Sequence, residues 1–351
     1  MMLERAELAA WGVGAIGLAL ALLGWLLEPA VFPHAWLAAL SSWIGWPLGS
    51  LALLLVHTLT GGRWGETIRP QLLAGVGTLP LLLPALLPLV FVLPTLYPWW
   101  HPSPALHLDN GFYLNRSFAV TRAIIYLIVW YGIAAAAMLA TRFGRIPPAV
   151  AVIGLLLLGL TVSFAAIDAT MSLDPHFSSS DYGMMAAAEA GLLALSVCVL
   201  LVTIGPPLSS DGLNDLGKLL QGLLVLWAYL DFVQLLIVWQ GDLPHEAPWY
   251  IERASHGWGA LAGIVAFGHF LLPFFVLVWP PLRRSRRVLG ATASLLIVME
   301  FLRAWWLVLP AAHRGFSWID IGSMAAVWGF SAALALRGPR LRLAFAEPGH
   351  G

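Results

Sequence analysis

Two acidic side chains stand within long apolar stretches of this sequence. Glu189 and Asp231 each lie inside a run of hydrophobic residues, and no basic residue lies within one helical turn of either one. An acid at the centre of a membrane-spanning helix costs about 2.5–3.5 kcal/mol on insertion scales. Burial favours the protonated form of a carboxyl group, so such a side chain can take up and release a proton near neutral pH. Proton transfer is therefore the first chemistry that the sequence indicates.

Further polar residues extend these two positions across the apolar runs. Gln234 follows Asp231 by one helical turn, and Ser196 and Thr203 follow Glu189 at intervals of seven, on the same helix face. Acids gather towards one side of the membrane and histidines towards the other. The candidate proton path consists of Asp168, Glu189, Asp231, Gln234, His57, His269, Ser196 and Thr203.

A basic residue also stands within an apolar run. Glu300 and Arg303 are three residues apart, which suits an internal ion pair, either structural or part of a relay. Arg303 is also the one cation inside the runs that could neutralise Asp231. A pair of Arg303 with Asp231 in place of Glu300 would remove most of the support for a proton relay through Asp231.

The same polar residues suit other functions. A quinone headgroup needs hydrogen-bond donors and a proton acceptor beneath an apolar entrance, and Asp168 or His176 could supply the acceptor. A bis-histidine haem needs two facing histidines at matched depth, and His57 and His269 are only loosely matched. The polar groups could instead hold a purely structural scaffold together. A solute transporter ranks last, because the sequence lacks paired interrupted helices in matching halves.

Composition shows which elements must position these residues. Of 351 residues, 60% are hydrophobic and only 10% are charged, whereas soluble domains carry about 25% charged residues. The sequence therefore predicts an all-α integral membrane protein. Its net charge of zero gives no indication of nucleic-acid binding. The single cysteine, Cys198, excludes an internal disulfide and a cysteine-based metal cluster, and we expect no metal site and no covalently bound cofactor.

We predict ten membrane spans in one polytopic domain, 1–351. Their approximate bounds are 8–27, 36–60, 71–96, 118–141, 146–168, 181–205, 217–240, 250–279, 288–309 and 316–336. Pro80, Pro84 and Pro88 predict a kink in the third span, with its freed carbonyls satisfied by neighbouring helices. Asp320 is expected to cap the tenth. Thirteen basic residues fall in one set of connections and four in the other, so both termini are expected in the cytoplasm.

Two stretches resemble a known family. They are "DATMSLDPHFSSSDYG", 168–183, and "WAYLDFVQLLIVWQGDLPHEAPWYIER", 227–253. Both are similar to signatures of the NrfD-related membrane subunits of bacterial alternative complex III, the ActF type above all, and 47–83 is similar to the early helices of that family. The residues that match the signatures are Asp168, Met171, Ser172, Pro175, His176, Asp231, Gln234, Trp239, Gly241, Pro244, Glu246, Pro248, Trp249 and Tyr250. Ala169 and Phe177 stand where the family usually has tryptophan.

The resemblance implies a fold and a set of partners. It implies two four-helix bundles with two flanking helices, in the inner membrane of a bacterium. It implies a quinol:electron-acceptor oxidoreductase with a sister NrfD-like subunit, an iron–sulfur protein and c-type cytochromes, so that haem c and iron–sulfur clusters are carried by partners. The subunit itself is expected to contribute a transmembrane proton path, or to bind quinol, or to support its sister. The sequence leaves open whether it catalyses anything.

Overall fold

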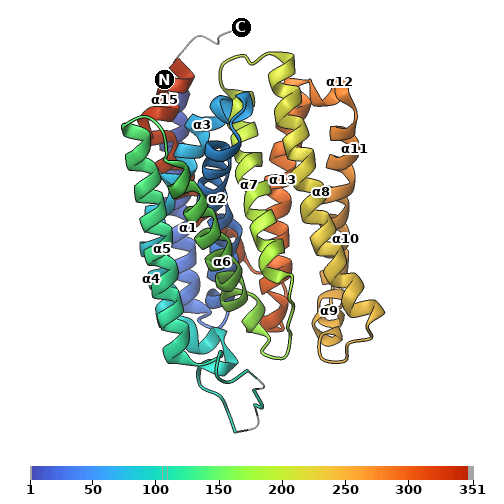
Figure 1. Ribbon diagram of the computed structural model, residues 1–351. Helices are drawn as coiled ribbons and strands as arrows, with labels where there is room; N and C mark the ends of the chain where they lie inside the picture. The colour runs from blue at the N-terminus through green and yellow to red at the C-terminus, as the bar shows by residue number, and fades with distance from the viewer. Residues whose placement is uncertain (1, 105, 109, 347–351) are drawn as a thin grey trace.

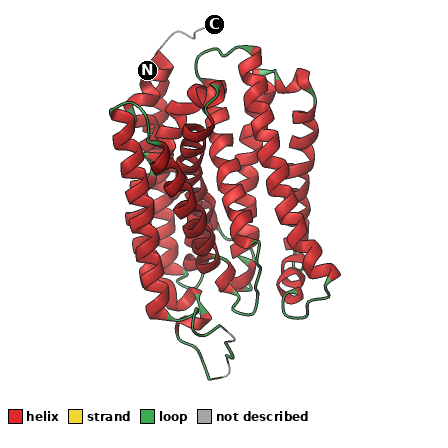
Figure 2. Cartoon of the chain, in the orientation of Figure 1, coloured by secondary structure: helices red, strands yellow, loops and turns green. Residues whose placement is uncertain are grey.

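The computed structural model describes residues 2–104, 106–108 and 110–346, and within them the chain is helical without any strand (Figures 1 and 2). Ten helical segments are long and apolar enough to cross a membrane. The sequence-based prediction of an all-α integral membrane protein with ten spans is therefore confirmed.

Eight spans are single helices, and the third and eighth are interrupted. The single helices are α1 (Met2–Leu27), α2 (Phe32–Thr60), α5 (Arg116–Arg142), α6 (Pro148–Ala169), α7 (Tyr182–Ile204), α8 (Ser210–Gln240), α13 (Arg286–Val308) and α14 (Trp318–Arg337). The third span consists of α3 (Arg63–Val76), η1 (Leu79–Leu81) and α4 (Leu82–Leu96). The eighth consists of α10 (Trp258–Val265), η4 (Ala266–Leu271) and α11 (Leu272–Val278). Shorter elements are η2 (Pro98–Trp100), η3 (Met171–Leu173), α9 (Ala247–Ala254), α12 (Pro280–Arg283), η5 (Pro310–Ala312) and α15 (Pro339–Ala346).

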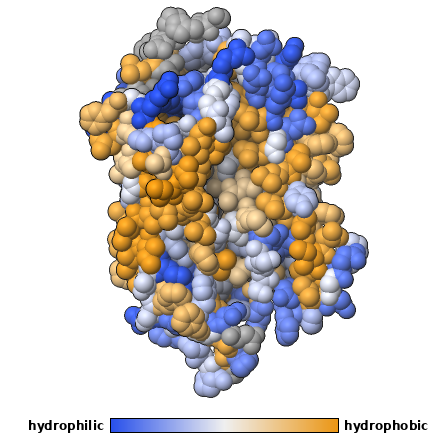
Figure 3. Space-filling view, viewed as in Figure 1, coloured by the Kyte–Doolittle hydropathy of each residue, from blue (hydrophilic) through white to orange (hydrophobic). Residues whose placement is uncertain are grey.

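The helices run roughly parallel to one axis, and α1 begins at the same end of the bundle as α15 (Figure 1). We call this the inner end; the opposite end, which carries the long 97–115 connection and α9, is the outer end. Hydrophobic residues form a broad band between two more hydrophilic ends (Figure 3). Such a band is the surface that a lipid bilayer covers.

Helices α2 and α7 form the centre of the bundle and approach each other closely. A Cβ atom added at Gly49 of α2 would lie 1.9 Å from the backbone oxygen of Ala190 in α7. Only glycine allows this approach, which is how small residues bring membrane helices together. Because Ala190 adjoins Glu189, the contact also fixes the depth and rotation at which α7 presents that carboxyl group. Helix α14 packs along α1 at one side of this centre.

The third span breaks between α3 and α4, as its prolines predict. Pro80 lies in η1, and two neighbouring helices satisfy nearby carbonyl groups. The Tyr131 hydroxyl of α5 donates to the oxygen of Leu79 at 3.0 Å, and Trp36 of α2 donates to that of Ala85 at 2.8 Å. The break in the third span is therefore confirmed, and neighbouring helices hydrogen-bond to its backbone on both sides of Pro80 and Pro84.

The eighth span differs from the prediction at its outer end. Sequence analysis gave one segment, 250–279, whereas the structure separates α9 from α10 and begins the span at Trp258. The chain turns at His256 and Gly257, whose φ angles are 50° and 88°. Two successive residues with positive φ cannot continue a right-handed α-helix, and glycine adopts this left-handed conformation without steric cost. The amphipathic α9 is thereby free to lie at the outer end.

Candidate functional site

The side chain of Arg303 forms the centre of a buried charged cluster. It projects from α13 and is 1% exposed. Its Nη1 lies 2.9 Å from Oδ1 of Asp231 in α8, and its Nε donates to Oε1 of Glu189 in α7. We refer to Arg303, Glu189, Asp231 and Glu300 as the Arg303 cluster. It joins three helices through one guanidinium, whose fixed fork of donors suits several carboxylates at once.

One sequence-based expectation is corrected here. Arg303 was expected to pair with Glu300, and it instead forms ion pairs with Glu189 and Asp231. The pair with Asp231 is the arrangement that removes most of the support for a proton relay through Asp231. Glu300 lies close enough to interact electrostatically with both Glu189 and Arg303, and its residue is only 5% exposed. Spacing along one helix cannot reveal a partner on another, and the long arginine side chain reaches across to α7 and α8.

The cluster holds more acid than base. Its three carboxyl groups share one guanidinium, so with all four groups ionised the net charge is 1 − 3 = −2. The side chains of Glu189 and Asp231 are 13% and 39% exposed, so Asp231 is the most accessible. Uncompensated charge in a low-dielectric interior is costly, and each proton bound to a carboxyl group reduces it by one unit.

Aromatic and sulfur groups surround the guanidinium on its remaining sides. Its Cζ lies 5.1 Å from the ring centroid of Trp227, and Nη2 donates to the sulfur of Met185 at 3.3 Å. His269 stacks on Trp227 with ring centroids 4.2 Å apart. His269 is 1% exposed, and its Nδ1 has no hydrogen-bond partner among the described residues. It lies in η4, a π-helical turn, and such turns are frequent at functional sites.

A chain of polar groups leads from the cluster towards the outer end. Tyr250 of α9 lies within electrostatic range of the Asp231 carboxylate and close to the Gln234 side chain. Gln234 in turn lies 2.5 Å from the Ser179 hydroxyl, which lies 2.7 Å from Oδ1 of Asp181. Burial and the nearby Asp231 raise the pKa of Tyr250, so its hydroxyl stays protonated and able to donate. Hydrogen bonds therefore join Gln234 to Asp181 at the start of α7, and Asp231 lies one helical turn from Gln234.

The cluster lies within the outer half of the membrane. Asp231 precedes the end of α8 by nine residues, which is about 14 Å of helix, and Glu189 follows the start of α7 by seven residues, about 10 Å. The depths expected from the sequence were similar. Of the candidate proton-path residues, the structure thus brings together Glu189, Asp231, Gln234 and His269, around Arg303.

Asp168 belongs to a separate, fully satisfied site. Its two carboxylate oxygens accept from Nε and Nη2 of Arg122 at 2.9 and 2.8 Å, and the Tyr126 hydroxyl donates to it at 2.8 Å. The guanidinium also stacks over Tyr113, 3.7 Å from the ring centroid. Burial and Asp168 raise the pKa of the Tyr113 phenol. This bidentate pair ties α5 to α6 and engages both oxygens of Asp168, which favours a structural role.

The remaining predicted residues lie apart from the cluster. His57 lies near the end of α2, where its Nε2 is 3.0 Å from the oxygen of Gly62. Ser196 and Thr203 donate to carbonyls of their own helix, α7. His176 is exposed in the outer connection. Among the described residues, His57 contacts Gly62 and Trp64, whereas His269 stacks on Trp227. These contacts do not bring the two histidines together as haem ligands. Among the described residues, no group of three histidine, cysteine or acidic side chains is arranged to hold a metal ion.

Asp320 performs the capping role expected of it and has a further partner. Its carboxylate accepts from the backbone N–H of Ser317, while the Ser317 hydroxyl accepts from the start of α14, which completes a capping box. The same carboxylate, fully buried, accepts from both terminal nitrogens of Arg314 at 2.9 and 2.7 Å. The outer end of α14 is therefore fixed by charge as well as by its cap.

The two signature-like stretches meet in space. The ring of Phe177 stacks on that of Trp249, with centroids 4.5 Å apart and an angle of 14° between the planes. Trp249 also stacks under the guanidinium of Arg253, which is 1% exposed. Burial lowers the pKa of Arg253 to about 10. Aromatic packing of Phe177 and Trp249 therefore holds α9 against the outer connection at the outer end.

Sequence reasoning missed three contributors to these sites. Arg122 was counted only as a basic residue near a span end, and Tyr250 and Ser179 were not assigned a role in proton transfer. The sequence does contain a signal for Arg122, because this arginine falls inside the predicted fourth span. A charged side chain at such a position must find a partner within the membrane. No comparable signal marks Ser179, which reaches Gln234 only through the fold of the outer connection.

A scan of the chain against protein-family models gives no match, and a search of curated proteins gives none either.

Proposed function

We propose that this chain is a proton-conducting membrane subunit of a quinol-oxidising electron-transfer complex, with the Arg303 cluster as the place where protons are held. The observation that carries the proposal is the excess of acid in that cluster: three carboxyl groups around one guanidinium, on helices that cross the membrane. Such groups inside a membrane are typical of proton relays.

The residues have distinct roles in this proposal. Arg303 holds Glu189 and Asp231 in place and lowers the cost of their ionisation. Within the described residues Glu300 forms no ion pair of its own, and in this proposal it holds the exchangeable proton. Asp231 is paired with Arg303, which removes most of the support for a relay through Asp231 itself, so its proposed role is to position Arg303. The proposed exit towards the outer surface is the hydrogen-bonded chain of Gln234, Ser179 and Asp181.

The similarity of the 168–183 and 227–253 stretches to the NrfD-related subunits of alternative complex III supports the assignment to such a complex. Those stretches supply Asp231, Gln234 and Tyr250 of the polar chain. On this proposal the partners are a sister membrane subunit, an iron–sulfur protein and c-type cytochromes, in a bacterial inner membrane with the inner end in the cytoplasm. Haem c and iron–sulfur clusters belong to those partners.

The test is quinol-driven proton translocation by the intact complex in liposomes. We expect Glu300→Gln to reduce the number of protons moved per electron while the complex still assembles. Asp242→Asn is the matched control, because Asp242 is an exposed acid at the outer end whose φ of 45° asparagine tolerates. Wild-type stoichiometry and rate in Glu300→Gln would remove the basis of the proposal.

A structural scaffold is the second candidate, and a specific observation favours it. Asp168, Asp231, Glu189 and Asp320 each have an arginine partner, as expected for acids that only hold helices together. In a scaffold, substitutions at these positions would change assembly or stability alone. The quinol-binding alternative gains no such support, because Asp168 is already satisfied by Arg122.

A further inference from the structure

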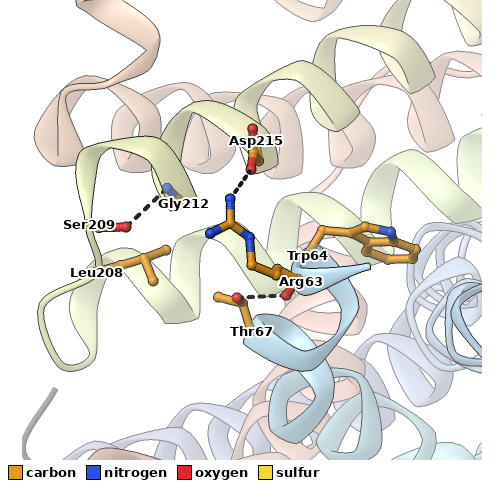
Figure 4. A pocket seen from close by; sticks show the side chains of 7 residues that line it. All are labelled: Arg63, Trp64, Thr67, Leu208, Ser209, Gly212 and Asp215. Atoms are coloured by element: carbon orange, nitrogen blue, oxygen red, sulfur yellow. Dashed lines mark hydrogen bonds and ion pairs between the residues drawn. The ribbon is translucent and has the colours of Figure 1, made fainter. Parts of the chain in front are cut away.

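A pair of adjoining pockets opens at the inner end of the bundle, far along the helices from the Arg303 cluster. They lie between the beginnings of α3 and α8, with volumes of about 90 and 270 Å³. Figure 4 shows the side chains that surround the smaller one. The lining residues that bear on a ligand are Arg63, Trp64, Leu208, Asp215, Lys218 and Leu219.

The charged groups of these pockets are unbalanced in favour of base. Nη2 of Arg63 lies 3.9 Å from Asp215, and Nζ of Lys218 lies 4.0 Å from the same carboxylate. Two cations therefore share one anion, which leaves one positive charge in excess. Within the part of the chain that the structure describes, the Arg63 guanidinium makes no hydrogen bond, and its side chain is 89% exposed. Its donors are available to a ligand.

Backbone groups add to the positive potential. Both α3 and α8 begin beside the pockets, and the first residues of a helix present unpaired N–H groups. Gly62 occupies the N-cap position of α3, and none of the described side chains caps this helix start. An anion at this place would accept from the guanidinium of Arg63 and from the ammonium group of Lys218, with the helix dipoles oriented favourably.

The apolar lining shows which kind of anion fits. Trp64, Leu208 and Leu219 are half-buried beside the charged groups, at the boundary between the hydrophilic inner end and the hydrophobic band. Tryptophan prefers this boundary in membrane proteins. A ligand with a phosphate group and an acyl chain can satisfy both parts at once, whereas free phosphate makes no use of the apolar part. Basic pockets between membrane helices are suited to anionic lipid headgroups.

We propose that the Arg63–Lys218 pocket binds the phosphate group of an anionic phospholipid from the inner leaflet. The phosphate lies between Arg63 and Lys218, and an acyl chain runs outwards along Trp64 and Leu219. Asp215 opposes the ligand, because it competes for both cations. The site is independent of proton transfer in the Arg303 cluster.

The test is a titration of the purified full chain in detergent with dioleoylphosphatidylglycerol, with bound lipid counted by native mass spectrometry. Each basic residue close to an anionic lipid surface contributes about fivefold in affinity, so we expect about 25-fold weaker binding in Arg63→Gln/Lys218→Gln. Asp215→Asn should bind about fivefold more tightly. Arg142→Gln/Arg145→Gln, which removes two exposed charges outside the pocket, is the matched control and should bind like the wild type.

Each remaining outcome contradicts the proposal. Equal losses in the pocket variant and the control would show a general effect of charge and no site. Unchanged binding in the pocket variant, or weaker binding in Asp215→Asn, would also overturn it. Dioleoylphosphatidylcholine that binds as tightly would show that anionic charge is not recognised. Inorganic phosphate that binds as tightly as the lipid would assign the pocket to a soluble anion and refute the lipid assignment.

Discussion

Replacing Arg303 by glutamine tests the Arg303 cluster most severely. Among the described residues, Arg303 is the cation that pairs with Glu189 and Asp231, and its removal leaves three carboxyl groups without this counter-charge. Removing one partner of a buried ion pair costs about 3–5 kcal/mol. Arg303 is 1% exposed, so water cannot replace the lost donors, and we expect the free energy of unfolding to fall by that amount.

Replacing the acids of the cluster should lower the free energy of unfolding by less than Arg303→Gln does. The order of these losses should follow the exposed fraction of each side chain. Asp231→Asn removes a pair that is partly open, since its side chain is 39% exposed, and should cost about 1 kcal/mol. Glu189→Gln should cost more, because that side chain is 13% exposed. In Arg303→Gln the same Glu189→Gln change should become favourable, because it now removes an uncompensated carboxylate. The resulting coupling energy should be about 2–3 kcal/mol.

The assay is reversible unfolding in mixed detergent micelles, followed by circular dichroism, for the wild type, the single variants and the double variant. Each variant is compared over the same range of denaturant, so that differences in the free energy of unfolding are meaningful. Additive effects of Arg303→Gln and Glu189→Gln would refute the idea that these side chains act as one unit.

Three further predictions follow from local geometry. Arg122→Gln should lower the free energy of unfolding by about 3 kcal/mol, because it leaves a half-buried carboxylate unpaired, and a change below 1 kcal/mol in the same assay would contradict this. Gly49→Ala should prevent the close approach of α2 to α7 and lower the yield of folded protein. The control is Gly132→Ala, which has open space around it and should be neutral or stabilising by about 0.5–1 kcal/mol. Equal yields and equal melting temperatures of the two variants in detergent would contradict the Gly49 contact. Asp320→Ala removes the acidic member of the capping box and the buried partner of Arg314, so the free energy of unfolding should fall by about 2–4 kcal/mol. Thermal melting measures this loss, and hydrogen exchange should show that the start of α14 loses its protection first.

The number and kind of spans could be predicted because each is a long apolar run, and hydropathy depends only on local sequence. The kink in the third span was equally local, since proline removes a hydrogen bond wherever it occurs. The outer limit of the eighth span was not predicted, because α9 is amphipathic and continues the sequence of α10 with only His256 and Gly257 to mark the turn.

The candidate site was predicted only in part. The position of Glu189 and Asp231 inside apolar runs identified them as unusual, and helix spacing placed Gln234 beside Asp231. Spacing also suggested Glu300 as the partner of Arg303, which was wrong, because an arginine side chain can reach a neighbouring helix that spacing does not describe. Which helices adjoin is decided by packing contacts such as that of Gly49 with α7, and these depend on residues far apart in the chain.

The most direct test of a proton held in the Arg303 cluster is the infrared absorption of protonated carboxyl groups, recorded as a difference spectrum when quinol is added to the intact complex. We predict a carboxyl band that changes on quinol addition and is absent in Glu300→Gln, with the band retained in the Asp242→Asn control. A difference spectrum with no such band, or one that Glu300→Gln leaves unchanged, would contradict the role of the cluster in proton transfer.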